Sequence, residues 1–279
     1  MIFEIKKENF KSIYNILDDQ IDNVEVKAVI EGNNPGWIFA DSNISPKTAV
    51  VWSKGIQGFY FVGDHNNPEF NNYLNDHIDK KIIPRVIKEN LDRFEFSGEN
   101  EKWCSKLEEI FANRELNKSK QMIYKFNYDQ WDNYQKRELN DKFRLRKIDA
   151  ELLSDSKIEN LDYIISEILR WWDSCEKYLE ETFGYCIILD NKIVSYCICN
   201  FVYDNIHTIG IETLKGYRRK GLSQSAAEAF VEECIADKLN PHWECMESNL
   251  ASRALAEKLK FNRERVYSLY SFSFNKEIT

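Results

Sequence analysis

A run of basic residues followed by a glycine is the part of this chain best suited to bind an anion. Arg218, Arg219 and Lys220 come directly before Gly221, and Ser223 follows two residues later. Glycine lets the backbone approach a ligand closely, and an arginine can bind two phosphate oxygens in parallel. If a helix begins here, its first N–H groups and the positive end of its dipole add to the attraction. The segment is therefore predicted to bind a pyrophosphate.

The residues on either side of this run predict a strand before it and a helix after it. Residues 205–213 carry the β-branched and aliphatic side chains typical of a strand. Residues 222–235 place apolar side chains at helical spacing, so one broad face of the helix is apolar. A short strand over 243–246 and a helix over 250–259 come next, before a final strand over 266–274. The basic turn thus joins a strand to a long amphipathic helix.

The second half of the chain begins with further alternating elements. A strand is expected over 143–148 and a helix over 158–172. Strands over 185–189 and 192–201 are joined by Asp190 and Asn191, a pair that accepts the positive φ of a tight hairpin turn. The order of elements predicts an α/β (α+β) fold built on a mixed sheet.

The first half repeats part of this order, which suggests a degenerate internal duplication. Its strands are expected over 37–40, 48–52, 58–62, 93–96 and 121–126, with a helical region over 69–89 interrupted at Pro84 and a second helix around Trp103 and Phe111. The polar stretch 128–142 is the best candidate for a boundary. We therefore expect one domain over 1–135 and another over 143–279.

Composition excludes several classes of protein. The formal net charge is -8 and no long basic run is present, so nucleic acid is not an expected partner. The N-terminus has no apolar core typical of a signal peptide, and no stretch is apolar enough for a membrane span, so we expect a cytoplasmic protein. Seven cysteines without framework or paired spacing predict buried thiols, with neither disulfides nor a metal site. The sequence leaves a homodimer open.

Two strings in the second half resemble signatures of the GNAT superfamily of acetyltransferases. The first is Arg-x-x-Gly-x-Ser, from Arg218 to Ser223, at the opening of a long helix. The second is a helix led by Asn249 that ends at Phe261. Residues 211–261 as a whole resemble the branch of zwittermicin-resistance-type acetyltransferases, whose GNAT domain also follows a second domain. The resemblance implies a mixed-sheet GNAT fold in the C-terminal half, behind a degenerate GNAT-like N-terminal domain.

The resemblance also implies acetyl-CoA as co-substrate and places it on this chain. The strand backbone at 211–213 is expected to hold the pantetheine arm, and the N–H groups of 219–224 the pyrophosphate. The coenzyme is expected to lie between two splayed parallel strands, 205–213 and 243–246. The residues assigned to coenzyme binding are Ile211, Glu212, Thr213, Arg218, Arg219, Lys220, Gly221, Leu222, Ser223, Gln224, Asn249 and Ser252.

Two residues are candidates for the base that deprotonates an amine, because they resemble positions used by relatives. His207 has the suitable unperturbed pKa of about 6.5, whereas Glu244 needs burial to raise its pKa. Each can equally be an ordinary strand residue without a catalytic role, and proximity alone can supply much of the rate.

The chain departs from the family pattern at three positions. Ser223 replaces the usual Gly or Ala of the loop, Lys260 replaces a Gly, and Ala256 stands where relatives often carry a Tyr as general acid. In the first half, Asp64 and His65 fall where a phosphate loop would be needed, so no coenzyme is expected there.

The resemblance implies an N-acetyltransferase that moves an acetyl group from acetyl-CoA to a primary amine of a small molecule. The amine would attack directly in a ternary complex, and the acidic surface favours a cationic acceptor. Two alternatives stay open. A non-catalytic acyl-CoA sensor is suggested by Ala256, and a GNAT-shaped interaction module without a coenzyme site is suggested by Ser223 and Lys260.

Overall fold

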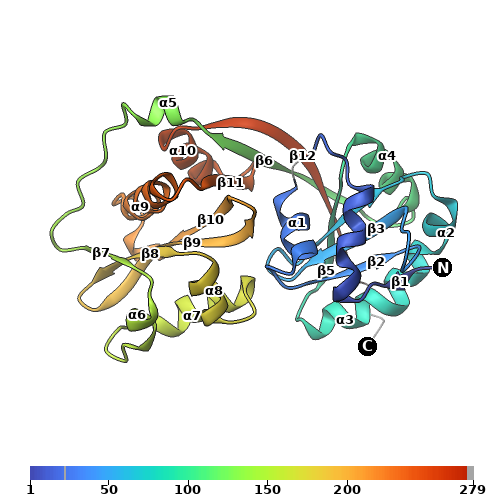
Figure 1. The fold of residues 1–279 in the computed structure, drawn as a ribbon, viewed down its shortest axis with the longest axis horizontal. Coiled ribbons are helices and arrows are strands. Elements are labelled where there is room, and N and C mark those ends of the chain that lie inside the picture. The colour runs from blue at the N-terminus through green and yellow to red at the C-terminus, as the bar shows by residue number, and fades with distance from the viewer. Residues whose placement is uncertain (22, 275–279) are drawn as a thin grey trace. The chain divides into compact units, whose positions relative to one another are not determined.

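The computed structural model describes residues 1–21 and 23–274, which form two compact units (Figure 1). Unit 1 contains Met1–Gln121 and the described residues from Val266 onward, and unit 2 contains Met122–Arg265. The division falls within two long strands, β6 (Asn117–Phe126) and β12 (Phe261–Ser273), which both units share. These bounds differ from the ranges 1–135 and 143–279 expected from the sequence.

The difference arises because the last strand returns to the first unit. Residues 270–273 of β12 pair antiparallel with β5 (Arg93–Gly98), with Tyr270 opposite Phe96 and Ser273 opposite Arg93. Tyr270 stacks on Phe96 with ring centroids 5.4 Å apart, so aromatic packing reinforces the pairing. The C-terminal strand therefore completes the sheet of unit 1.

The sheet of unit 1 is mostly antiparallel, in the order β1, β2, β3, β4, β5, β12. Only β4 and β5 pair in parallel among its described strands. The strands not yet bounded are β1 (Phe3–Glu4), β2 (Gly36–Ala40), β3 (Thr48–Ser53) and β4 (Gly58–Gly63).

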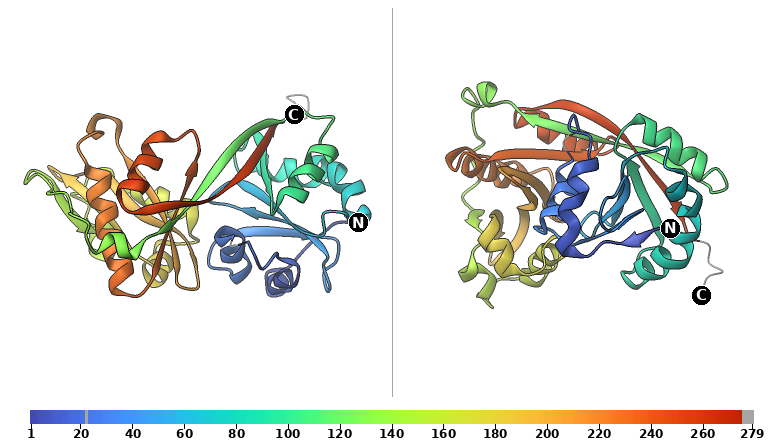
Figure 2. Two further views of the ribbon diagram at one scale, coloured as in Figure 1. Left: turned by 90° about the horizontal axis from the view of Figure 1, so that it is seen from above. Right: turned by 45° about the vertical axis from the view of Figure 1, so that its right-hand side comes forward.

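Helices cover both faces of this sheet (Figure 2, left). One face carries the 3₁₀ helix Lys7–Ile16 and α1 (Val24–Glu31), and the other carries α2 (Pro68–His77), α3 (Ile83–Lys88) and α4 (Glu101–Ile110). Because side chains alternate along a strand, neighbouring residues of β3 enter different clusters. Val50 packs with the aromatic cluster under α2–α4, and Val51 packs with the aliphatic cluster under α1.

The sheet of unit 2 has the order β6, β11, β10, β9, β8, β7. The pairs from β7 to β10 are antiparallel, whereas β10 and β11 are parallel. The strands are β7 (Arg144–Lys147), β8 (Gly184–Leu189), β9 (Lys192–Tyr203), β10 (Ile206–Thr213) and β11 (Asn240–Met246). Asp190 and Asn191 have φ of 47° and 63°, which confirms the predicted tight hairpin between β8 and β9.

Two groups of helices lie on opposite faces of this sheet in Figure 1. Helix α9 packs on β8, β9 and β10 from one side, and α7 contacts β9 from the other. The helices of unit 2 are α5 (Tyr128–Trp131), α6 (Ala150–Ser154), α7 (Leu161–Trp171), α8 (Cys175–Glu181), α9 (Leu222–Ala236) and α10 (Leu250–Lys258).

The interruption predicted within 69–89 lies just before Pro84. The chain forms α2, then a π-helical turn over Ile78–Ile82, and then α3, in which Pro84 occupies the first turn. Proline has no N–H to donate and its ring crowds the preceding turn, so a continuous α-helix cannot pass through it.

Candidate active site

The parallel strands β10 and β11 separate after only three paired positions. Ile206 pairs with Asn240 and Thr208 pairs with His242, and no later pair joins them among the described residues. On its other edge, β10 stays paired with β9 as far as Thr213, after a bulge between His207 and Ile209. The edge of β10 that β11 leaves therefore presents backbone N–H and C=O groups to the opening, as the resemblance implied.

The basic turn adopts the backbone needed to bring N–H groups together. Arg219 and Gly221 have φ of 62° and 81°, both in the left-handed region. For Arg219 this conformation is strained, while glycine adopts it without cost. Gly221 is the N-cap of α9, and none of the described side chains caps the helix. The first N–H groups of α9 and the positive end of its dipole are thus available to an anion.

A cleft of about 500 Å³ opens between this turn, the end of β10 and the start of α10. Its lining includes all residues expected to bind the coenzyme except Lys220 and Gln224. The Nζ of Lys220 lies 5.3 Å from the ring centroid of Tyr217, and the buried Gln224 side chain bonds to Tyr134 and Glu228. The lining residues are Ile211, Glu212, Thr213, Tyr217, Arg218, Arg219, Gly221, Leu222, Ser223, Asn249, Ala251, Ser252 and Leu255.

Asn249 and Ser252 form the far wall through capping contacts. The Asn249 side chain accepts a hydrogen bond of 3.1 Å from the Ser252 N–H, which caps α10. The Ser252 hydroxyl accepts from the indole N–H of the buried Trp243 at 3.0 Å. Both side chains are therefore held in fixed orientations at the edge of the cleft.

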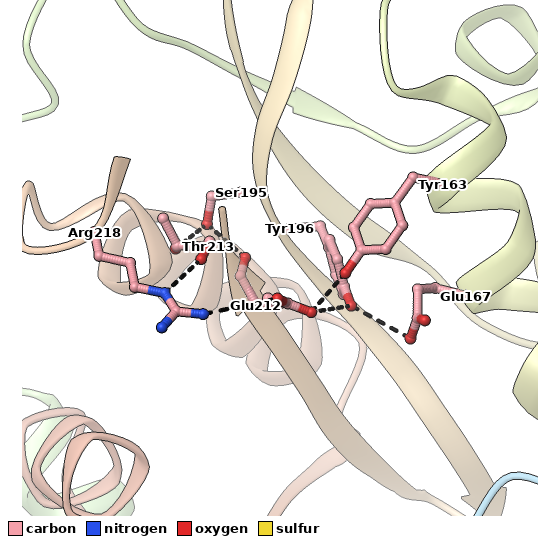
Figure 3. Close-up of polar contacts among 7 residues, drawn as sticks. All are labelled: Tyr163, Glu167, Ser195, Tyr196, Glu212, Thr213 and Arg218. Carbon is pink, nitrogen blue, oxygen red and sulfur yellow. Dashed lines mark hydrogen bonds and ion pairs between the residues drawn. The ribbon is translucent and has the colours of Figure 1, made fainter. Parts of the chain in front are cut away.

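The Glu212 carboxylate contacts both Arg218, which lines the cleft, and Tyr163 of helix α7 (Figure 3). On the cleft side, Arg218 lies 3.9 Å from this carboxylate, and its Nε donates to the carbonyl of Thr213 at 3.0 Å. On the α7 side, the hydroxyl of Tyr163 donates to Glu212 at 2.6 Å. The Glu212 side chain therefore points toward α7.

Two further side chains complete this group. The Tyr196 hydroxyl lies 3.5 Å from the Glu212 carboxylate and 3.4 Å from that of Glu167. Tyr163 and Glu167 are one helical turn apart, so α7 presents both to β9 and β10. These contacts were not predicted from the sequence. The helical spacing of apolar residues predicted that Ile164 and Ile168 face the core. It could not predict which side chains Tyr163 and Glu167 contact.

Burial and the hydrogen bond to Glu212 raise the pKa of Tyr163 to about 12. Because this value is above the pKa of about 10 of an unfolded tyrosine, the folded chain holds the phenolic proton more tightly. The corresponding stability is present below about pH 10 and is lost as the pH rises toward about 12. We expect Tyr163→Phe to lack this loss. The free energy of unfolding of wild type and Tyr163→Phe, measured by urea unfolding between about pH 10 and pH 12, tests this expectation. The phenolate absorbance of the folded proteins follows the ionisation itself. An identical pH dependence of the unfolding free energy in the two proteins would contradict it.

The two candidate bases lie in different surroundings. His207 is 4% exposed, and its ring stacks on Phe183 with centroids 5.8 Å apart. Burial lowers the pKa of His207, so its imidazole is neutral near pH 7. Glu244 lies on β11 past the last paired residue, with its carboxylate 3.9 Å from the Nε2 of His242. Neither His207 nor Glu244 lines the cleft described above.

Known proteins are similar to this chain over most of its length. The family model for GNAT acetyltransferases matches residues 15–270. The chain belongs to the GNAT acetyltransferase family. It is 26% identical to the uncharacterized N-acetyltransferase YdfB of Bacillus subtilis (strain 168) over 268 residues, 96% of this chain and 97% of the relative. Family membership makes the protein an acyl-CoA-dependent N-acyltransferase.

Solved structures share its fold. A GCN5-related N-acetyltransferase-like protein from Streptococcus suis 89/1591 superposes with a TM-score of 0.66 at 20% identity, covering 95% of this chain and 98% of that one. A tandem GNAT protein from the clavulanic acid biosynthesis pathway gives 0.63 at 8% identity, covering 98% of both chains. The predicted mixed-sheet α/β fold of the GNAT type is therefore confirmed.

The departures from the GNAT pattern have visible structural consequences. Lys260, where the resemblance leads us to expect glycine, has a left-handed backbone with φ of 68°, a conformation that glycine adopts most readily. Ala256 is fully buried in α10. A general acid is therefore not supplied at that position.

The remaining expectations concern metals, thiols and membranes. Over residues 1–21 and 23–274, no group of three or more His, Cys, Asp or Glu side chains is placed to hold a metal ion. The cysteines are free thiols, and burial raises the pKa of Cys197 and Cys199 well above the usual range. Within the same residues, no helix combines the length and apolar character required to span a membrane.

Proposed function

We propose that unit 2 transfers an acetyl group from acetyl-CoA to a primary amine of a small molecule. The observation that carries this proposal is the uncapped start of α9, with Arg219 and Gly221 in left-handed conformations beside the open edge of β10. Such a site offers several N–H donors and a dipole to a diphosphate. The open strand edge offers hydrogen bonds to the amide groups of a pantetheine arm.

In this proposal the coenzyme lies along the cleft residues already described. The backbone of 211–213 binds the pantetheine amides, and the N–H groups of 219–224 bind the diphosphate. Arg218 fixes the end of β10 by donating to the Thr213 carbonyl. Asn249 and Ser252 form the opposite wall. Acetyl-CoA supplies the activated acyl group as a thioester, and the amine attacks it directly.

Of the two candidate bases, Glu244 has the more favourable position. It lies beyond the point where β11 leaves β10, whereas His207 is enclosed beside Phe183. A positioned base contributes roughly 10²–10⁴-fold to such a reaction. We therefore expect Glu244→Gln to lower kcat about 100-fold and to leave acetyl-CoA affinity unchanged.

The measurement is steady-state thiol release with an accepted amine, beside calorimetric titration with acetyl-CoA. Glu247→Gln is the matched control, because Glu247 is exposed three residues further along the chain. Wild-type kcat in Glu244→Gln would remove Glu244 from the mechanism.

We propose that unit 1 does not bind the coenzyme. Its parallel strands β4 and β5 stay paired from Gly58 opposite Glu95 to Phe61 opposite Gly98, so they do not separate as β10 and β11 do. At their end, the carboxylate of Glu99 accepts the Gly63 N–H at 3.2 Å. The Gly63 N–H, at the position where a phosphate-binding loop would begin, is therefore already hydrogen-bonded to a carboxylate of the protein.

The closeness of residues 211–261 to zwittermicin-resistance-type acetyltransferases stays part of this proposal, as does a cationic acceptor. The direct test is thiol release from acetyl-CoA in the presence of a panel of polyamines, aminoglycosides and amino-sugar antibiotics. Release that depends on one of these amines supports the transferase. Binding of acetyl-CoA without release on any of them would favour the acyl-CoA sensor, and absence of binding would favour an interaction module.

A further inference from the structure

We propose that Arg137, in the segment between α5 and β7, is a ligand of the coenzyme diphosphate. The inference rests on the proposed function of the cleft. It adds a residue from outside the strand–turn–helix motif, in a stretch that the sequence marked only as a polar boundary. The segment belongs to unit 2, as the cleft does.

The Arg137 side chain lies directly against the N-cap of α9. A Cβ added to Gly221 would come within 2.4 Å of the Arg137 Nε and 2.7 Å of its Cδ and Cζ. The guanidinium therefore contacts the residue at which the open N–H groups of α9 begin. The absence of a side chain at position 221 is what makes room for it.

A buried carboxylate fixes the backbone of this segment on α9. Glu228, only 3% exposed, accepts hydrogen bonds from the Tyr134 hydroxyl, from the Arg137 N–H at 3.3 Å and from the Gln224 side chain at 2.8 Å. Tyr134 also stacks on Trp131 with ring centroids 4.5 Å apart. Burial, together with the bond to Glu228, raises the pKa of Tyr134, so its hydroxyl stays a donor. The backbone that carries Arg137 is thus held in place on α9.

The charges around the turn leave a role for one more cation. Arg218 is directed to Glu212 and the Thr213 carbonyl, and Lys220 lies over the ring of Tyr217. Arg137 is exposed and has no carboxylate within ion-pair distance among the described residues. A guanidinium offers a planar fork of donors that matches two phosphate oxygens. A diphosphate seated on the start of α9 would therefore meet Arg137 as well as Arg219.

The test is calorimetric titration of the full chain with acetyl-CoA and with its 3′-dephospho form, comparing wild type, Arg137→Ala, Arg137→Lys and Lys136→Ala. We expect Arg137→Ala to raise the Kd about tenfold for both ligands, as the loss of one charge-assisted contact does. The Kd of Arg137→Lys should lie between those of wild type and Arg137→Ala, because lysine keeps the positive charge but lacks the planar pair of donors. Lys136 lies in the same segment as Arg137 and pairs with Glu232 of α9 at 2.6 Å. The Kd of Lys136→Ala should therefore stay within about twofold of the wild-type value.

Each other outcome overturns the assignment. Unchanged or tighter binding by Arg137→Ala would show that Arg137 is no ligand, or that it occupies the site and competes with the coenzyme. A loss seen with acetyl-CoA but not with the dephospho form would place Arg137 on the 3′-phosphate instead. Circular dichroism confirms that the variants are folded. If wild type binds neither ligand, the proposed function fails, which is distinct from a wild type that binds and an Arg137→Ala variant that binds equally well.

Discussion

Gly221→Glu is expected to abolish measurable acetyl-CoA binding, with a loss of about 1000-fold or more in affinity. The residue has φ of 81°, a conformation that costs an L-residue about 1–2 kcal/mol. Its new Cβ would also displace the Arg137 guanidinium. The added carboxylate would repel a diphosphate by about 4 kcal/mol at 4 Å for an effective dielectric constant of about 20. These effects act together at the start of α9.

Gly216→Glu is the matched control for this variant. Gly216 lies in the same turn, and a Cβ added there would have no atom of residues 1–21 or 23–274 within 4 Å. The same charge is introduced, but outside the cleft lining. We expect its affinity for acetyl-CoA to fall less than about fivefold, through screened charge effects alone. Equal losses in the two variants would mean that net charge, and not the geometry of the turn, governs binding.

Trp172→Ala is expected to destabilise unit 2 by about 4 kcal/mol, the usual cost of a large aromatic side chain removed from a core. Trp172 is fully buried at the end of α7, and its indole N–H donates to the Cys199 carbonyl at 2.9 Å. It also packs edge-to-face on Tyr178 of α8, with centroids 5.9 Å apart. The side chain thus ties both helices to β9. Its loss should also loosen the contact of Tyr163 with Glu212.

Urea unfolding followed by circular dichroism measures this loss. Trp172→Phe retains most of the apolar contact and leaves the Cys199 carbonyl without its donor, so about 1–2 kcal/mol is expected. A change below about 1 kcal/mol in Trp172→Ala would show that α7 and α8 are held by other contacts.

The position of the basic turn between a strand and a helix could be predicted because its information is local. The strand, the basic run, Gly221 and the helix follow one another directly in the chain, and the strand, Gly221 and the helix adopt the conformations that their own residues favour. The hairpin at Asp190 and Asn191 is local in the same sense. The anion binding proposed for the turn rests mainly on backbone N–H groups and on cations adjacent in the chain.

The rest depends on contacts between residues far apart in the chain. The pairing of β12 with β5 joins Ser273 to Arg93, and nothing in the final strand itself specifies which sheet it completes. The bond from Tyr163 to Glu212 spans 49 residues, and the bond from Arg137 to Glu228 spans 91. Polar residues on a helix or in a loop do not reveal their partners. The polar stretch 128–142 was predicted to be a domain boundary because the residue that holds it, Glu228, lies far away in the chain, on α9.

Calorimetric titration of the wild-type protein with acetyl-CoA tests the central claim most directly. The separated strands and the uncapped start of α9 in unit 2, together with the paired strands of unit 1, predict one site per chain with a dissociation constant on the order of micromolar. Two sites per chain would contradict the assignment of the coenzyme to unit 2 alone. Absence of binding would contradict the claim that the cleft holds acetyl-CoA.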